Sequence, residues 1–208
     1  MLAVLQRQYA VKIQPRRPAP HHHIAVVQHD LAHRIAPPRT AELERTRRQI
    51  MHRLSRAAEY KDNETGHHVI RVGEIAAVLA RALGLDENDC ANLRDCAPLH
   101  DIGKIGIPDE ILLKPGKFDP DERERMQAHA ANGGALIDRL IEDFGLAGNP
   151  RVKTLRSIVA WHHEYIDGSG YPEGRSGDEI PLATRIITIS DIFDALTTKR
   201  SYKQAMQS

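Results

Sequence analysis

Apolar residues recur at helical spacing in five segments of the chain, and this periodicity constrains the fold more than any other feature. In the first segment Val72, Ile75 and Leu79 share one face, and Gly84 is typical of the position after a helix end. No segment reads convincingly as a strand, and only 4% of the residues are aromatic. We therefore predict an all-α domain, with helices over residues 66–83, 87–102, 120–142, 150–163 and 182–198.

The two longest connections between these helices are predicted loops. The segment 105–119 contains Pro108 and Pro115, and it ends at Asp119, a candidate N-cap that precedes Pro120 at the first helical position. The segment 164–180 is rich in glycine and follows a helix rather than a strand, so we interpret it as a lid and not as a phosphate-binding loop.

The N-terminal part differs in composition from the rest. Residues 1–39 hold five of the twelve prolines, five of the twelve histidines and six Lys or Arg against one acid, which predicts a flexible basic tail or linker. Residues 40–61 predict a polar helix with a narrow apolar stripe. This helix is either a connector that pairs with a second copy in a homodimer or an amphipathic helix that lies on its own domain. The main domain is expected over residues 62–208.

Charge and cysteine content exclude several classes of protein. The net charge is 29 − 28 = +1, so no overall field attracts nucleic acid. No apolar run approaches the roughly 20 residues of a membrane span. Cys90 and Cys96 do not share a helix face and cannot form a disulfide framework. They are interpreted as reduced thiols, and the expected location is the cytoplasm, with no membrane and no nucleic acid as partner.

Each main-domain segment directs an imidazole or a carboxylate toward the interior. His68 continues the stripe of Val72, whereas its neighbour His67 falls on the solvent face. Each buried polar group without a partner costs about 1–3 kcal/mol, and a shared metal centre satisfies all of them together. The candidate ligands are Glu64, His68, His100, Asp101, His129, His162, His163 and Asp191.

The kind of metal follows from this donor set. Eight groups are too many for one tetrahedral zinc, and no cysteine joins them. Nitrogen donors combined with carboxylates favour two or three iron or manganese ions, and zinc or nickel stays open.

The same residues lie in four motifs that together resemble the HD-GYP domains, bacterial phosphodiesterases for cyclic di-GMP within the HD hydrolase superfamily. The resemblance covers about residues 40–203. The motifs are Glu64-Thr65-Gly66-His67-His68, His100-Asp101-Ile102-Gly103-Lys104-Ile105-Gly106-Ile107-Pro108, His162-His163-Glu164 with Asp167-Gly168-Ser169-Gly170-Tyr171-Pro172, and Asp191-Ile192-Phe193-Asp194-Ala195-Leu196.

The resemblance implies an HD-domain helical bundle and assigns all eight candidate ligands, with Asp101 bridging two ions. A glutamate at the position of Glu64 goes with members that hold three ions. The implied reaction is hydrolysis of cyclic di-GMP to pGpG and GMP by a hydroxide held between metal ions, with Asp101 and Lys104 as catalytic residues. The positions of Asp194, Arg200 and Lys203 match substrate contacts in the family, and Lys104, also a candidate substrate contact, matches the lysine of the HD motif.

Several alternatives remain open. Lys104 either adds positive charge at the phosphate or pairs with Asp62 or a ligand carboxylate, and Tyr171 either stacks on guanine or anchors its loop. The whole domain is alternatively a non-catalytic module that binds the nucleotide or a diguanylate cyclase, or an HD hydrolase for another nucleotide such as cyclic GMP-AMP.

The extent of the chain also departs from the family pattern. Family domains usually continue for one or two helices beyond the position of Ser208, and residues 1–39 do not resemble the upstream receiver domain that is common in the family. We therefore expect either a short protein or a fragment.

Overall fold

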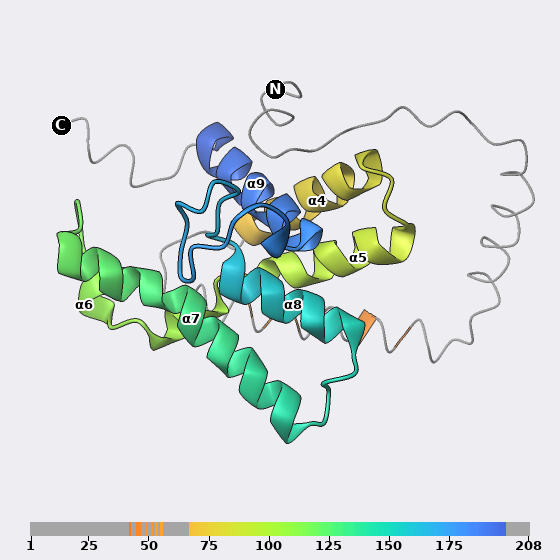
Figure 1. Ribbon diagram of the computed structural model, residues 1–208, viewed down its shortest axis with the longest axis horizontal. Helices are drawn as coiled ribbons and strands as arrows, with labels where there is room; N and C mark the ends of the chain where they lie inside the picture. The colour runs from red at the N-terminus through yellow and green to blue at the C-terminus, as the bar shows by residue number, and fades with distance from the viewer. Residues whose placement is uncertain are drawn as a thin grey trace, which may run out of the picture. The chain divides into compact units, whose positions relative to one another are not determined.

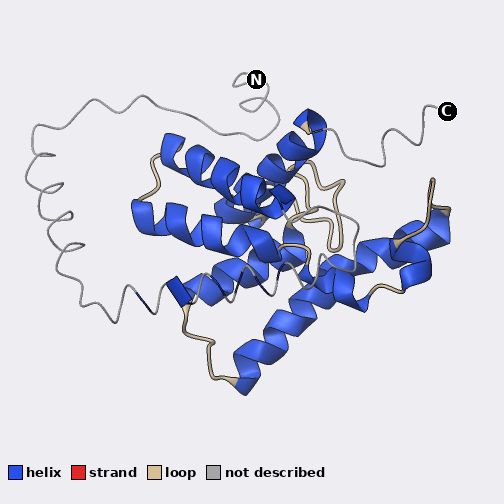
Figure 2. Ribbon diagram, turned by 180° about the vertical axis from the view of Figure 1, so that it is seen from behind, coloured by secondary structure: helices blue, strands red, loops and turns tan. Residues whose placement is uncertain are grey.

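The computed structural model describes residues 67–198 and the single positions 42, 45, 46, 49, 51, 53 and 55. Within this part of the chain every regular element is a helix (Figure 2), and one isolated bridge joins Asp167 to Ser176. The predicted all-α class is confirmed. None of the helices among the described residues combines the length and the apolar character that a membrane crossing requires.

Among the described residues, five long helices pack together (Figure 1). They are α4 (His67–Ala82), α5 (Glu87–Cys96), α7 (Pro120–Asp143), α8 (Pro150–Trp161) and α9 (Leu182–Thr197). Short helical turns lie between them: η1 (Ala97–Leu99), η2 (Ile102–Gly106), α6 (Asp109–Leu112) and η3 (Gly177–Glu179). Helix α4 packs against α5 and α9, and α7 packs against η2 and α8. These contacts bring parts of α4, α7, α8 and α9 and the turns η1 and η2 close to one another.

Local sequence signals explain where the helices begin and end. The Asp119 side chain accepts the backbone N–H of Glu122, whose own side chain accepts the N–H of Asp119, and Pro120 occupies the first turn of α7. This capping box confirms the predicted helix start. After α4, Gly84 has a φ of +84°, the left-handed conformation expected of a glycine beyond a helix end.

The prediction of one helix over 87–102 was wrong. Helix α5 ends at Cys96, and the chain continues through the 3₁₀ turn η1, which contains Pro98. A proline inside an α-helix lacks the N–H that would bond four residues back, and its ring clashes with that carbonyl. The predicted irregular segment 105–119 likewise contains the short helix α6. The break at Pro98 matters because it reorients the residues that follow, His100 and Asp101.

The core consists of two apolar clusters. The larger lies among α4, α5, α8 and α9 and includes the free, buried thiols of Cys90 and Cys96, which form no disulfide, as predicted. The smaller joins Leu99 and Ile102 to Ile137 of α7 and Val159 of α8. It therefore fixes the segment around His100 and Asp101 against the two helices that carry further candidate ligands.

The N-terminal predictions fall mainly outside the described residues. All of 1–39 and most of 40–61 are not described, and the described positions between 42 and 55 are helical. The connector helix and its role in a dimer stay predictions.

Candidate metal centre

The structure brings seven of the eight predicted ligands together, and the eighth, Glu64, lies outside the described residues. The donor atoms form two groups, in each of which they lie within 4.8 Å of one another. The His68 group consists of His68, His100 and Asp191, and the His129 group consists of Asp101, His129, His162 and His163. These residues come from α4, the turns around η1 and η2, the middle of α7, the end of α8, and α9.

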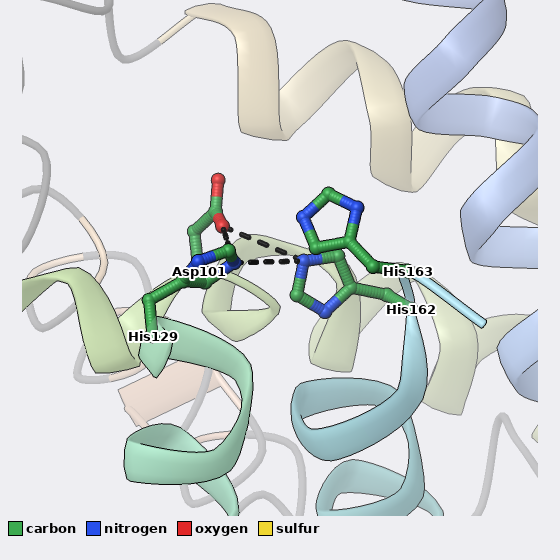
Figure 3. Close-up of side chains that lie close together, drawn as sticks. All are labelled: Asp101, His129, His162 and His163. Atoms are coloured by element: carbon green, nitrogen blue, oxygen red, sulfur yellow. Dashed lines mark hydrogen bonds and ion pairs between the residues drawn. The ribbon is translucent and has the colours of Figure 1, made fainter. Parts of the chain in front are cut away.

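The Asp101 carboxylate lies between the two groups. Its Oδ2 is 3.2 Å from Nε2 of His100, in the His68 group. Its Oδ1 is 3.2 Å from Nε2 of His129 and 3.5 Å from Nε2 of His162 (Figure 3). One carboxylate thus directs one oxygen toward each group, which is the arrangement that a bridging ligand requires.

Three imidazole rings are oriented by the backbone of the preceding turn. Nδ1 of His100 is 2.7 Å from the Ala97 oxygen, and Nδ1 of His129 is 2.8 Å from the Met126 oxygen. Nδ1 of His162 lies 3.2 Å from the oxygens of Ile158 and Val159. A carbonyl oxygen only accepts hydrogen bonds, so each Nδ1 donates. In the neutral rings Nε2 therefore carries the lone pair, and it faces the centre.

Such an arrangement suits a bound cation. Nε2 of His129 and Nε2 of His162 are only 3.4 Å apart, and two lone pairs repel at this distance unless a proton or a cation lies between them. Oδ1 of Asp101 is buried and accepts no hydrogen bond. Buried polar atoms of this kind normally have a partner. Imidazole nitrogens held in one tautomer beside an orphaned carboxylate oxygen fit a divalent metal ion.

At Asp101, His162 and His163 the electrostatics favour the protonation states of metal ligands. Burial lowers the pKa of His162, and it lowers the pKa of His163 to about 2, so both rings are neutral. Burial alone would raise the pKa of Asp101, but Lys104 and His100 outweigh it and hold that pKa well below its usual range. Burial disfavours the charged His100 ring, yet the adjacent Asp101 raises the pKa of His100 to about 9. His100 would hold a metal ion only after losing this proton.

Lys104 lies within η2, one turn after Asp101. Its Nζ is 2.9 Å from Oδ2 of Asp101, so the pairing with a ligand carboxylate, one of the alternatives for this lysine, is present. The ammonium group is half-buried beside the centre, where it adds positive charge next to the bridging carboxylate.

Two glycines allow η2 to approach α7 closely. A Cβ atom on Gly103 would overlap the carbonyl oxygen of His129 and would lie 2.6 Å from the backbone nitrogen of Gly133. A Cβ atom on Gly133 would lie 2.6 Å from the side chain of Val159. The absence of side chains at this crossing brings Asp101 within reach of His129.

The sequence matches one protein family and several known relatives. A family model described as HD domain matches residues 33–208. The chain belongs to the HD domain family. It is 42% identical over 164 residues to "Cyclic di-GMP phosphodiesterase response regulator RpfG" of Xanthomonas campestris pv. campestris, covering 79% of this chain and 42% of that protein. Together with further relatives named as cyclic di-GMP phosphodiesterases, this confirms the resemblance to the HD-GYP group.

The chain is also similar to two proteins that are named as phosphodiesterases specific for cyclic GMP-AMP. It is 41% identical over 162 residues to "3'3'-cGAMP-specific phosphodiesterase 2" of Vibrio cholerae, covering 78% of this chain and 30% of that protein. The crystal structure of the cyclic GMP-AMP-specific phosphodiesterase V-cGAP3 of V. cholerae matches with a TM-score of 0.52 at 21% identity, covering 77% of this chain and 43% of that one. This likeness supports the helical fold. The chain spans less than half the length of these relatives.

The loop of the HD domain that carries the GYP residues packs against the centre. The Tyr171 ring stacks on the His163 imidazole, with centroids 4.6 Å apart and an interplanar angle of 23°. The backbone N–H of Tyr171 donates to the carbonyl oxygen of His163 at 3.1 Å. A Cβ atom on Gly170 would lie 2.5 Å from the Cα of Glu164, so only glycine fits there. In this structure Tyr171 anchors the loop and orients His163.

Glu164 holds the far side of the same loop, a role that sequence reasoning missed although the residue stands beside the double histidine. Its carboxylate is 2% exposed. It accepts the backbone N–H of Glu173 at 2.7 Å and that of Arg175 at 2.9 Å. Trp161 adds a second attachment, since its Nε1 donates to Glu173 and its ring packs under the Arg175 guanidinium.

We expect Glu164→Gln to loosen this loop by about 1–3 kcal/mol, because the amide directs an NH₂ group at one of the two backbone donors. Hydrogen exchange at Glu173 and Arg175 measures the opening, and the fluorescence of Trp161, the only tryptophan, reports it independently. Glu179→Gln is the matched control, because Glu179 also accepts a backbone N–H, from Ser176, but in an exposed position. Equal effects of the two substitutions would contradict the role assigned to Glu164.

Only some of the predicted substrate contacts lie among the described residues. Arg200 and Lys203 lie outside the described residues. Asp194 is 2% exposed and lies behind His68, with Nδ1 of His68 2.7 Å from its Oδ2. In this position Asp194 contacts the candidate ligand His68.

Proposed function

We propose that this HD domain is a metal-dependent phosphodiesterase that hydrolyses cyclic di-GMP to pGpG and then to GMP. The observation that carries the proposal is the Asp101 carboxylate, which directs one oxygen toward each of two histidine groups. Relatives from X. campestris and Thermotoga maritima that are 42% and 40% identical carry the name cyclic di-GMP phosphodiesterase, which supports this choice of substrate.

The proposed centre holds two or three divalent ions, with iron or manganese favoured by the mixture of nitrogen and oxygen donors. Its ligands are Glu64, His68, His100, Asp101, His129, His162, His163 and Asp191. When bound, such ions lower the pKa of a water molecule toward about 7 and neutralise charge on a phosphodiester.

The side chains around the centre have separate tasks in this proposal. Asp101 joins the two groups, with one oxygen toward each. Lys104 places an ammonium group beside Asp101, where it stabilises negative charge that develops on the phosphate. Tyr171 keeps the His163 ring in place, and its loop excludes water from one side of the centre. Arg200 and Lys203, in the segment after α9, are proposed to bind the second phosphate of the cyclic dinucleotide.

A single preparation tests the proposal. The protein is purified under anaerobic, reducing conditions, its metal content is counted, and it is assayed on cyclic di-GMP and on cyclic GMP-AMP. The proposal expects at least two ions per chain and release of pGpG. A protein that contains two ions and binds cyclic di-GMP without cleaving it would establish the binding-module alternative instead.

The second candidate substrate is 3'3'-cyclic GMP-AMP. Relatives named for this nucleotide are 34–43% identical, and relatives named for cyclic di-GMP are 34–42% identical. Both molecules present two phosphodiesters to the centre and differ in one base, so the ratio of the two rates in the same assay decides between them.

His68→Ala is expected to remove metal from the protein, and His67→Ala is its matched control. The two histidines are adjacent at the start of α4, but His68 is buried against the centre and His67 is exposed. Elemental analysis of both variants measures the effect, and we expect the loss of about one ion per chain for His68→Ala only. Equal losses from both variants would contradict the ligand assignment.

A further inference from the structure

His68 is oriented differently from His100, His129 and His162. Those three rings donate Nδ1–H to a backbone carbonyl three or four residues earlier. His68 is the second residue of α4. Its Nδ1 instead lies 2.7 Å from Oδ2 of Asp194, and both side chains are almost completely buried. Among these four rings, only His68 is oriented by another side chain.

One helix holds both nitrogens of this ring. On α9, Asp191 and Asp194 are three residues apart and lie on the same face. Oδ1 of Asp191 is 3.2 Å from Nε2 of His68, on the side of the ring opposite to Asp194. The ring is therefore fixed between a candidate metal ligand and a carboxylate that only orients it.

Arg71 in turn fixes Asp194. It lies three residues after His68 on α4, and its guanidinium binds the carboxylate through two hydrogen bonds, Nε to Oδ1 at 2.6 Å and Nη2 to Oδ2 at 2.9 Å. The hydroxyl of Thr198 donates to Oδ1 at 3.2 Å. With His68, these donors fill about four acceptor positions of a carboxylate. Asp194 is therefore fully occupied in holding His68 and Arg71, with no acceptor position left for a substrate.

A carboxylate behind a metal-binding histidine fixes its tautomer and makes Nε2 a stronger donor to the ion. In this chain Asp194 orients a ring of the His68 group only. His129 and His162 of the His129 group are held by backbone carbonyls, which the replacement of Asp194 leaves in place.

We propose that Asp194 and Arg71 are a positioning pair that fixes the His68 imidazole and sets the metal affinity of the His68 group separately from that of the His129 group. The inference rests on the metal centre of the proposed function. It assigns to Asp194 a position behind the ligand in place of a contact with substrate.

The test is a titration of metal-free protein with Co²⁺, whose absorption spectrum follows each ion as it binds. We expect Asp194→Asn to weaken the binding of one Co²⁺ by about 10–100-fold and to leave the other within about twofold. Arg71→Met keeps the carboxylate but removes its support, and we expect a smaller loss, about 3–10-fold, at the same ion. Because the Arg71 side chain is 38% exposed, this variant also gives a result if Asp194→Asn does not fold.

Asp138→Asn is the matched control. Asp138 on α7 accepts the same two-pronged bond from Arg156 on α8, with Nε 3.1 Å from Oδ1 and Nη2 3.0 Å from Oδ2, away from the ligands. It is expected to lower the melting temperature without changing either Co²⁺ affinity. If Asp194 had a purely structural role, Asp194→Asn would lower only the melting temperature, or would weaken the binding of both Co²⁺ ions equally. Either result overturns the positioning role.

The wild-type titration separates the two proposals. If the wild-type protein binds no Co²⁺, the metal centre itself is wrong and the positioning pair fails with it. If it binds two ions, and both bind equally well to the Asp194→Asn and Arg71→Met variants, only the positioning pair is overturned.

Discussion

Asp101→Asn is expected to reduce phosphodiesterase activity by about 10³-fold or more while the helices remain folded. Even the loss of a residue that only hydrogen-bonds to a metal ligand lowers metal affinity or activity by about 10–100-fold. Asp101 directs an oxygen at both groups, and asparagine keeps only one side-chain oxygen and no negative charge, so it can no longer join them. Turnover of cyclic di-GMP and elemental analysis measure the two losses, and circular dichroism measures the fold.

The control for Asp101→Asn is Asp121→Asn, an exposed position in the first turn of α7. It carries the same change of charge and is expected to leave metal content and turnover unchanged. Full metal content and normal turnover in Asp101→Asn would show that this carboxylate does not join the two groups.

Gly103→Ala is expected to destabilise the domain by about 3 kcal/mol or more, a large effect for one methyl group. The new Cβ would overlap the His129 oxygen and lie 2.6 Å from the Gly133 nitrogen. Both are backbone atoms, so no side chain can rotate away, and η2 must separate from α7. That movement draws Asp101 away from His129, so metal binding should weaken together with stability. Thermal unfolding with and without metal measures both.

Gly106→Ala provides the comparison within the same 3₁₀ turn. Its Cβ would meet only the side-chain amide of Asn132, at an ordinary 3.5 Å. We expect a change of less than about 1 kcal/mol, because a glycine whose conformation suits alanine gains from the substitution through the unfolded state. If Gly103→Ala were as mild as Gly106→Ala, the close approach of η2 to α7 would not control the geometry of the centre.

Much of this fold was predictable because helical periodicity is a local property. In the stripe of Val72, Ile75 and Leu79, Val72 is buried and the other two are half-buried, and the same phase places His68 inward and His67 outward. The capping residues Asp119 and Pro120 act within one turn, so the start of α7 was also readable. The end of α5 was missed because the stripe continues past Cys96, whereas Pro98 changes the backbone.

The sequence by itself determined which side chains face inward, and therefore the donors available to a metal centre. Only the tertiary structure decided what lies opposite each of them. It placed the two oxygens of Asp101 toward different histidine groups, Asp194 behind His68, and Tyr171 on the ring of His163. The physical reason is that periodicity fixes the direction of a side chain relative to its own helix. The partner across the interface depends on how closely two helices pack, which here depends on glycines at a crossing.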